Sequence, residues 1–96
     1  KSISSEIPKE FKLEQNYPNP FNPETIIRFQ INRFSDVRLM VYDIQGKQVT
    51  DLVNQRYSAG VFEVNFNGSN YSSGVYFYSL YIDGKILNTK KMLMVK

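Results

Sequence analysis

The residue types that most often carry out catalysis are either missing from this sequence or too scattered to act together. The chain has no histidine and no cysteine, which removes the commonest general base and metal ligand as well as thiolate nucleophiles and disulfides. The carboxylates Asp43, Asp51, Glu63 and Asp83 fall at turns and on different strand patterns, so no periodicity pairs two of them for general acid–base catalysis. Ser73 has no histidine to activate it. We therefore expect a protein that is not an enzyme.

Metal, cofactor and membrane chemistry are not indicated either. Asp43 and the loop asparagines could offer oxygen ligands to calcium, but the sequence lacks the spacing of an EF-hand loop. No apolar run approaches the ~18–20 residues that cross a bilayer. We expect no cofactor, no metal ligand and no stable membrane insertion.

Basic charge is concentrated in one segment. The net charge of +3 depends on Lys85, Lys90, Lys91 and Lys96, because residues 85–96 contain no acid and the rest of the chain carries eight basic and nine acidic residues. Nucleic-acid binding would need a broad basic face, so we expect no nucleic-acid partner. A simpler interpretation is that these lysines lie on an edge strand and protect it from aggregation.

Alternating apolar residues predict an all-β protein. Period-two patterns predict seven strands, and they cover residues 11–15, 25–31, 37–42, 47–53, 62–66, 75–82 and 85–95. Residues 54–60 have the composition of a polar loop, and Asp83-Gly84 is a two-residue hairpin signal. About seven short strands at this spacing indicate an immunoglobulin-like antiparallel β-sandwich. Parity places Tyr76, Tyr78, Leu80 and Ile82 in its core.

The most unusual segment precedes the first strong strand pattern. It reads Asn16-Tyr17-Pro18-Asn19-Pro20-Phe21-Asn22-Pro23, and we call it the proline loop. Each proline fixes its own φ and keeps the preceding residue out of the helical region, so the segment must be a stiff, extended connector. We expect Tyr17 and Phe21 to be buried and to plug one end of the sandwich, with direct recognition by a receptor as the alternative. The Tyr17–Pro18 bond is open to either isomer.

Several motifs, in this order, resemble the C-terminal sorting domain of type IX secretion system cargo proteins. They are the proline loop with the preceding Leu13-Glu-Gln, then Thr25-Ile-Ile-Arg-Phe, Val41-Tyr-Asp-Ile-Gln-Gly46-Lys, Ala59-Gly60, Phe66-Asn-Gly68, Ser73-Gly74-Val-Tyr-Phe-Tyr78 and Lys90-Lys-Met-Leu-Met-Val-Lys96. The family often has Leu-Pro at Ile31-Asn32 and Trp-Asp-Gly at Phe66-Asn67-Gly68. The resemblance covers residues 11–96, and it adds Gly46, Gly60 and Gly74 to the family motif.

The resemblance implies a targeting function. Such domains belong to secreted enzymes and adhesins of Bacteroidota, which reach the periplasm of a Gram-negative cell and then cross the outer membrane through the type IX translocon. The implied partners are this translocon, sortase-like processing machinery and an N-terminal cargo domain. Cleavage and surface attachment can follow, so the implied location is secreted or at the cell surface. We expect residues 1–10 to be the linker from upstream cargo, since the chain begins at Lys1 with a polar stretch, and residues 11–96 to be the sorting domain.

Two candidate recognition surfaces follow. The last strand could pair with the translocon by strand addition, which makes Lys90, Lys91, Met92, Leu93, Met94, Val95 and Lys96 the candidate recognition segment. By parity, Met40, Tyr42, Phe77 and Tyr81 point away from the core on strands expected to be adjacent. They form a candidate exposed apolar patch that would dock the parent protein, a second copy by self-association, or the secretion machinery.

Other functions for a small sandwich stay open at this point. A carbohydrate-binding module could use Phe77, Tyr81 and Tyr42 to stack on sugar rings, although no convergent polar set accompanies them. A passive spacer of a secreted enzyme is a second alternative. A third is a domain like that of the flagellar hook-capping protein, which shares the Val-Tyr-Asp and Gly-Val-Tyr pieces.

Overall fold

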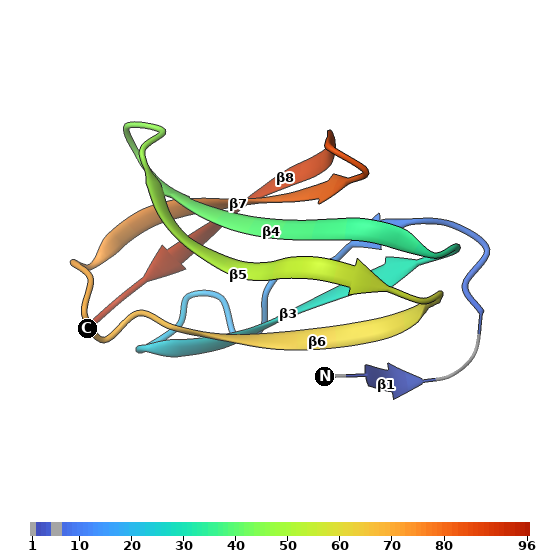
Figure 1. Ribbon diagram of the computed structural model, residues 1–96. Coiled ribbons are helices and arrows are strands. Elements are labelled where there is room, and N and C mark those ends of the chain that lie inside the picture. The colour runs from blue at the N-terminus through green and yellow to red at the C-terminus, as the bar shows by residue number, and fades with distance from the viewer. Residues whose placement is uncertain (1, 5–6) are drawn as a thin grey trace.

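The computed structural model describes residues 2–4 and 7–96, which form two antiparallel sheets packed face to face (Figure 1). The strands are β1 (Ser2–Ser4), β2 (Lys12–Leu13), β3 (Glu24–Ile31), β4 (Ser35–Asp43), β5 (Gln48–Tyr57), β6 (Gly60–Asn67), β7 (Gly74–Ile82) and β8 (Lys85–Met94). The described residues contain no helix. The seven predicted strands are present as β2–β8, which confirms the all-β sandwich.

The strand order brings two sheet edges together. One sheet has the order β1-β6-β3-β2 and the other β5-β4-β7-β8. β4 lies beside β7, as expected for an immunoglobulin-like sandwich. The edge strand β2 of the first sheet contacts the edge strand β8 of the second, so the chain that leaves β2 starts next to the last strand.

The core follows the predicted alternation. In β3, Ile27, Phe29 and Ile31 are buried while Ile26 and Arg28 face solvent, because successive side chains of a strand point to opposite faces. Tyr76, Tyr78, Leu80 and Ile82 are all buried as expected. Each large apolar side chain that is fully buried contributes about 1.5–3 kcal/mol.

Two boundaries differ from the sequence prediction. The prediction of a polar loop at 54–60 is wrong for the first half of that range, because β5 continues to Tyr57. β5 is an edge strand whose backbone pairs with β4 on one side only, so the exposed side chains of Asn54, Gln55 and Arg56 carry no apolar signal. Part of the expected linker also joins the sandwich, since β1 pairs with β6.

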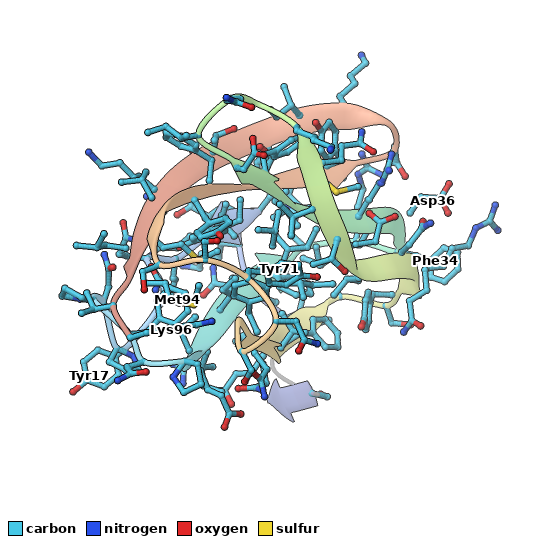
Figure 2. The ribbon with its side chains drawn as sticks, turned by 90° about the vertical axis from the view of Figure 1, so that its left-hand side faces the viewer. Tyr17, Phe34, Asp36, Tyr71, Met94 and Lys96 are labelled. Carbon is cyan, nitrogen blue, oxygen red and sulfur yellow. The ribbon has the colours of Figure 1, made fainter. Side chains whose placement is uncertain are left out.

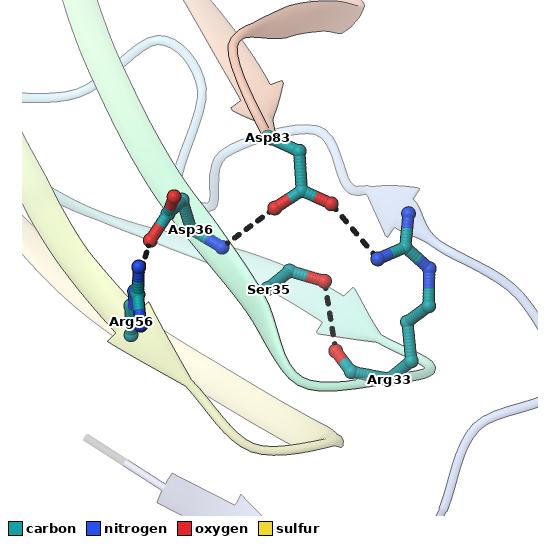
Figure 3. Close-up of polar contacts among 5 residues, drawn as sticks. All are labelled: Arg33, Ser35, Asp36, Arg56 and Asp83. Carbon is teal, nitrogen blue, oxygen red and sulfur yellow. Dashed lines mark hydrogen bonds and ion pairs between the residues drawn. The ribbon is translucent and has the colours of Figure 1, made fainter.

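The β7–β8 hairpin is tied to the start of β4 by the side chain of Asp83 (Figure 3). Asp83 and Gly84 have φ of 51° and 83°, as the predicted hairpin turn requires. Asp83 Oδ1 accepts a hydrogen bond of 2.9 Å from the backbone N–H of Asp36, and Oδ2 lies 2.8 Å from Arg33 Nη1. These two contacts lower the pKa of Asp83. Arg56 in turn pairs with Asp36 at 2.7 Å.

Candidate functional site

The proline loop is fixed at its start by Asn16, which is buried between the sheets. Its backbone N–H donates to the Tyr78 hydroxyl at 2.7 Å, and its side-chain Nδ2 donates to Pro18 O (3.1 Å) and Thr25 Oγ1 (3.0 Å). The Tyr78 hydroxyl reaches across from β7 of the other sheet and donates to Glu14 O at 2.8 Å. Burial raises the pKa of Tyr78 to about 12. This group of hydrogen bonds connects the two sheets at the root of the loop.

Of the two aromatic residues of the proline loop, one is buried and the other is exposed. Phe21 is 2% exposed, and its ring centroid lies 5.9 Å from that of Phe66 in an edge-on arrangement, so the prediction of a plug is confirmed there. The same prediction is wrong for Tyr17, which is 80% exposed and projects from the body of the domain (Figure 2). Tyr17 exchanges two backbone hydrogen bonds with Ile26 (3.0 and 2.9 Å). This pairing extends the edge of β3 and sends the Tyr17 side chain outward with that of Ile26.

The rest of the proline loop covers the free edge of β8. Four hydrogen bonds join residues 15–21 to residues 91–95. The donor and acceptor atoms are Gln15 Nε2 to Lys91 O (2.7 Å), Leu93 N to Asn19 Oδ1 (3.0 Å), Phe21 N to Leu93 O (3.0 Å) and Val95 N to Phe21 O (2.9 Å). The Tyr17–Pro18, Asn19–Pro20 and Asn22–Pro23 bonds are cis. Two sequence motifs about 70 residues apart therefore form one structural unit.

Within the candidate recognition segment, buried and exposed residues alternate. Met92 and Met94 point into the core and are fully buried, while Lys91, Leu93 and Val95 are exposed. A partner of the folded domain can therefore contact the second set of side chains but not the two methionines.

The charged residues divide by type. All four arginines form ion pairs with carboxylates, and these are Arg28–Glu63, Arg33–Asp83, Arg38–Asp51 and Arg56–Asp36. Over residues 2–4 and 7–96, no lysine forms an ion pair. Lys90 is half-buried, and Lys96 Nζ donates to Ser69 O at 2.9 Å. Lys91 is exposed and has no ion pair among the described residues, as is also true of Lys85 at the other end of β8.

The candidate exposed apolar patch needs a correction at Met40, which is only 3% exposed. Met40 lies opposite Ser79 on the outer face of its sheet, between the row that contains Tyr81 and the row that contains Tyr42. Tyr42 and Phe77 are half-buried partners in the next row. The hydroxyls of Tyr42 and Tyr81 share a hydrogen bond, and burial together with this bond raises the pKa of Tyr42 to about 12. The outer face is thus more closed around Met40 than parity alone predicts.

The motif glycines occupy three different settings. Gly46 (φ 83°) lies in the β4–β5 turn, Gly60 is buried at the start of β6, and Gly74 begins β7. The sequence interpretation gave no structural role to Gly68, where an added Cβ would lie 2.3 Å from Met94 Sδ. The absence of a side chain at position 68 makes room for the last buried residue of β8. The Phe66-Asn-Gly68 motif in the sequence could not show this contact.

The described residues show no convergent catalytic or metal-binding arrangement. No group of three His, Cys, Asp or Glu side chains among them could hold a metal ion. Asp51 and Glu63 are each paired with an arginine, on different sheets. Within the same residues, no helix is long and apolar enough to cross a membrane.

Comparison with known proteins identifies the family. The family model of the secretion system C-terminal sorting domain matches residues 15–96. Among curated proteins, none matches the chain. One similar solved structure is Pseudomonas fluorescens alkylpurine DNA glycosylase AlkC bound to DNA containing an abasic site analog, with a TM-score of 0.49 and 12% identity. The match covers 88% of this chain and 30% of that one.

The family match favours a sorting domain over a carbohydrate-binding module, a spacer or a hook-capping domain. It spans both halves of the structural unit described above, the proline loop and the last strand. The chain belongs to the secretion system C-terminal sorting domains, the C-terminal targeting signals of type IX secretion.

Proposed function

We propose that this domain directs a cargo, attached on its N-terminal side, through the outer-membrane translocon of the type IX system, and that residues 90–96 contact that translocon. Sortase-like machinery then removes the domain and leaves the cargo secreted or attached to the cell surface of a Gram-negative bacterium. The observation that carries the proposal is the family match over residues 15–96. The exposed Lys91, Leu93 and Val95 support the choice of segment.

The position of the N-terminal strand is compatible with this role. β1 lies on the edge of its sheet opposite β2, and β2 is the strand that contacts β8 (Figure 1). A cargo that continues from β1 therefore leaves the domain on the side away from the proline loop. The last strand stays accessible while the cargo is attached.

The first experiment tests the domain as a whole. A fluorescent carrier with a signal peptide for inner-membrane export is expressed, with and without residues 1–96 at its C-terminus, in a bacterium with a type IX system. We expect the fusion outside the cell or on its surface and the carrier alone in the periplasm. Equal retention of both in the periplasm would refute the proposed function, and equal release would show that the domain is a spacer.

The second experiment tests the segment. Deletion of Met92–Lys96 removes buried Met92 and Met94 and is expected to destabilise the fold. A matched variant therefore keeps both methionines and changes Lys91, Leu93 and Val95 to serine. We expect this variant to melt like the parent and to leave the carrier in the periplasm. Full secretion of the folded variant would exclude residues 90–96 as the contact.

A further inference from the structure

Over residues 91–95, the edge of the last strand that strand addition to the candidate recognition segment would need is already occupied. A partner strand binds an edge through backbone N–H and C=O groups that point away from the sheet. In β8 and the residue after it, these groups at Lys91, Leu93 and Val95 are bonded to Gln15, Asn19 and Phe21. A partner could reach them only by displacing the proline loop, whose Phe21 side chain is buried in the core. In the folded domain, the available part of the segment is therefore its outward side chains.

Those side chains continue onto the neighbouring strand. In the β7–β8 ladder, Lys91 lies opposite Phe77 and Leu93 lies opposite Val75. Directly opposed residues of antiparallel strands point to the same face, so the four side chains form one surface, which we call the outer patch. Leu93 is 39% exposed, Lys91 is exposed, and Val75 and Phe77 are half-buried. Tyr42, opposite Phe77 on β4, extends this surface across the sheet.

The composition of the outer patch defines the partner that fits it. Three apolar side chains lie on the same face as the Lys91 ammonium group, and no ion pair neutralises Lys91 within the described residues. A complementary surface is apolar with a carboxylate opposite Lys91. An exposed leucine beside a lysine on an edge strand adds nothing to the core, whereas an exposed apolar surface rimmed by polar groups is typical of a protein contact.

From these observations we infer that the secretion machinery reads the last strand through the outer patch, by side-chain contact with an apolar and acidic protein surface, and without strand addition. The inference rests on the proposed function and specifies its contact. It joins the last strand to Val75 and Phe77 as one recognition surface, with the proline loop as the element that holds the strand in place.

Matched variants on β8 test the outer patch in the carrier fusion. Lys91→Glu and Leu93→Ser change the patch, while Lys85→Glu and Ile86→Ser make the same changes on the same strand near the β7–β8 turn, where Ile86 is 57% exposed. We expect the two patch variants to reduce secretion at least about tenfold, as truncation of a central contact does, with parental melting temperatures. The two control variants should secrete like the parent. Parental secretion by both patch variants, or equal losses in the controls, would overturn the inference.

Phe77→Ser extends the test to β7. Because Phe77 is half-buried, the melting temperature of Phe77→Ser is compared with that of a control variant, Val61→Ser. Val61 is a half-buried apolar residue on β6 of the other sheet. A loss of secretion by folded Phe77→Ser, with secretion retained by an equally destabilised Val61→Ser, supports the outer patch. Equal secretion by the two variants would remove β7 from the recognition surface and contradict the inference.

A third variant separates side-chain contact from strand addition. Asn19→Ala removes the acceptor of Leu93 N–H and loosens the cover on the β8 edge. Strand addition predicts more secretion from this variant, because the edge becomes easier to reach, whereas contact through the outer patch predicts parental or lower secretion. An increase would overturn the inference. It would leave the proposed function intact, since that function fails only if the complete fusion is not exported.

Discussion

Tyr78→Phe is expected to weaken the connection between the two sheets without creating a cavity. The Tyr78 side chain is fully buried, and its hydroxyl both accepts from Asn16 N–H at 2.7 Å and donates to Glu14 O at 2.8 Å. Phenylalanine keeps the ring and removes only the hydroxyl. The substitution therefore leaves one buried N–H and one half-buried carbonyl without their partner, at the point where the proline loop begins.

The size of the effect follows from the burial of these two groups. A buried donor left without a hydrogen bond costs about 1–3 kcal/mol. Glu14 is half-buried, so water can replace part of the bond to its carbonyl, and the total loss is about 2–3 kcal/mol. For a domain of this length, each kcal/mol corresponds to roughly 4–8 °C. The melting temperature should fall by about 10–20 °C.

The assay is urea and thermal unfolding followed by circular dichroism, with Tyr76→Phe as the control. Tyr76 donates to Ser72 O at 2.6 Å, but Ser72 is exposed, so water can replace that bond and the loss should stay below ~1 kcal/mol. If Tyr78→Phe unfolds at the same urea concentration as the parent, or if both variants lose equal stability, the hydroxyl does not connect the sheets and the reasoning is refuted.

The same residue gives a pH dependence. Burial raises the pKa of Tyr78 from 10.0 to about 12, so the unfolded chain loses this proton first as the pH rises. The stabilisation is complete below about pH 10 and is lost as the pH rises toward 12. Tyr78→Phe should therefore flatten the alkaline decline in stability. It should not abolish that decline, because the pKa of Tyr42 is also raised to about 12.

Three further substitutions test other contacts. Gly68→Ala should cost about 1–3 kcal/mol by overpacking, since its Cβ would meet Met94 Sδ at 2.3 Å, and adding Met94→Ala should recover part of that loss in a double-mutant cycle. Asp83→Asn should make unfolding less sensitive to acid, because the pKa of Asp83 is lowered in the folded domain. The stabilisation by the Asp83 carboxylate is present above its unfolded pKa, about 3.8, and is lost as the pH falls through the lower folded pKa. Unchanged acid unfolding would contradict this. Asn16→Ala should cost about 1–3 kcal/mol, because it removes the donor to Thr25 Oγ1 and leaves the Thr25 hydroxyl as the remaining donor to Pro18 O. A midpoint equal to that of the parent in urea would refute this.

Local patterns were sufficient to predict most of the fold. Alternation identified the strands from β2 to β8, and it placed Tyr76 and Tyr78 in the core because a strand with one buried face has a side-chain period of two. The Asp83-Gly84 turn was equally readable, since both residues adopt positive φ. The end of β5 was not, because an edge strand facing solvent carries the same polar residues as a loop.

The candidate site was less predictable because it depends on contacts between distant segments. Tyr17 and Phe21 have similar apolar areas, and only the pairing of Tyr17 with Ile26 decides that one points outward. Parity placed Met40 on the outer face of its sheet, but its burial there depends on neighbouring strands, where Tyr42 of β4 and Tyr81 of β7 are joined by their hydroxyls. The cover on the β8 edge requires residues 15–21 to meet residues 91–95, and no local pattern in either segment contains that information.

The composition of the proline loop suits its place beside β8. An ordinary strand in this position would satisfy β8 and then present its own open edge to a further strand. Pro18, Pro20 and Pro23 have no N–H to donate, so the loop ends the ladder where it lies. It binds the last strand through the backbone of Phe21 and the side chain of Asn19. Phe21 is therefore the residue of the loop whose backbone pairs with this strand. The edge of the last strand is therefore closed over residues 91–95, while the outward side chains of Lys91, Leu93 and Val95 stay exposed.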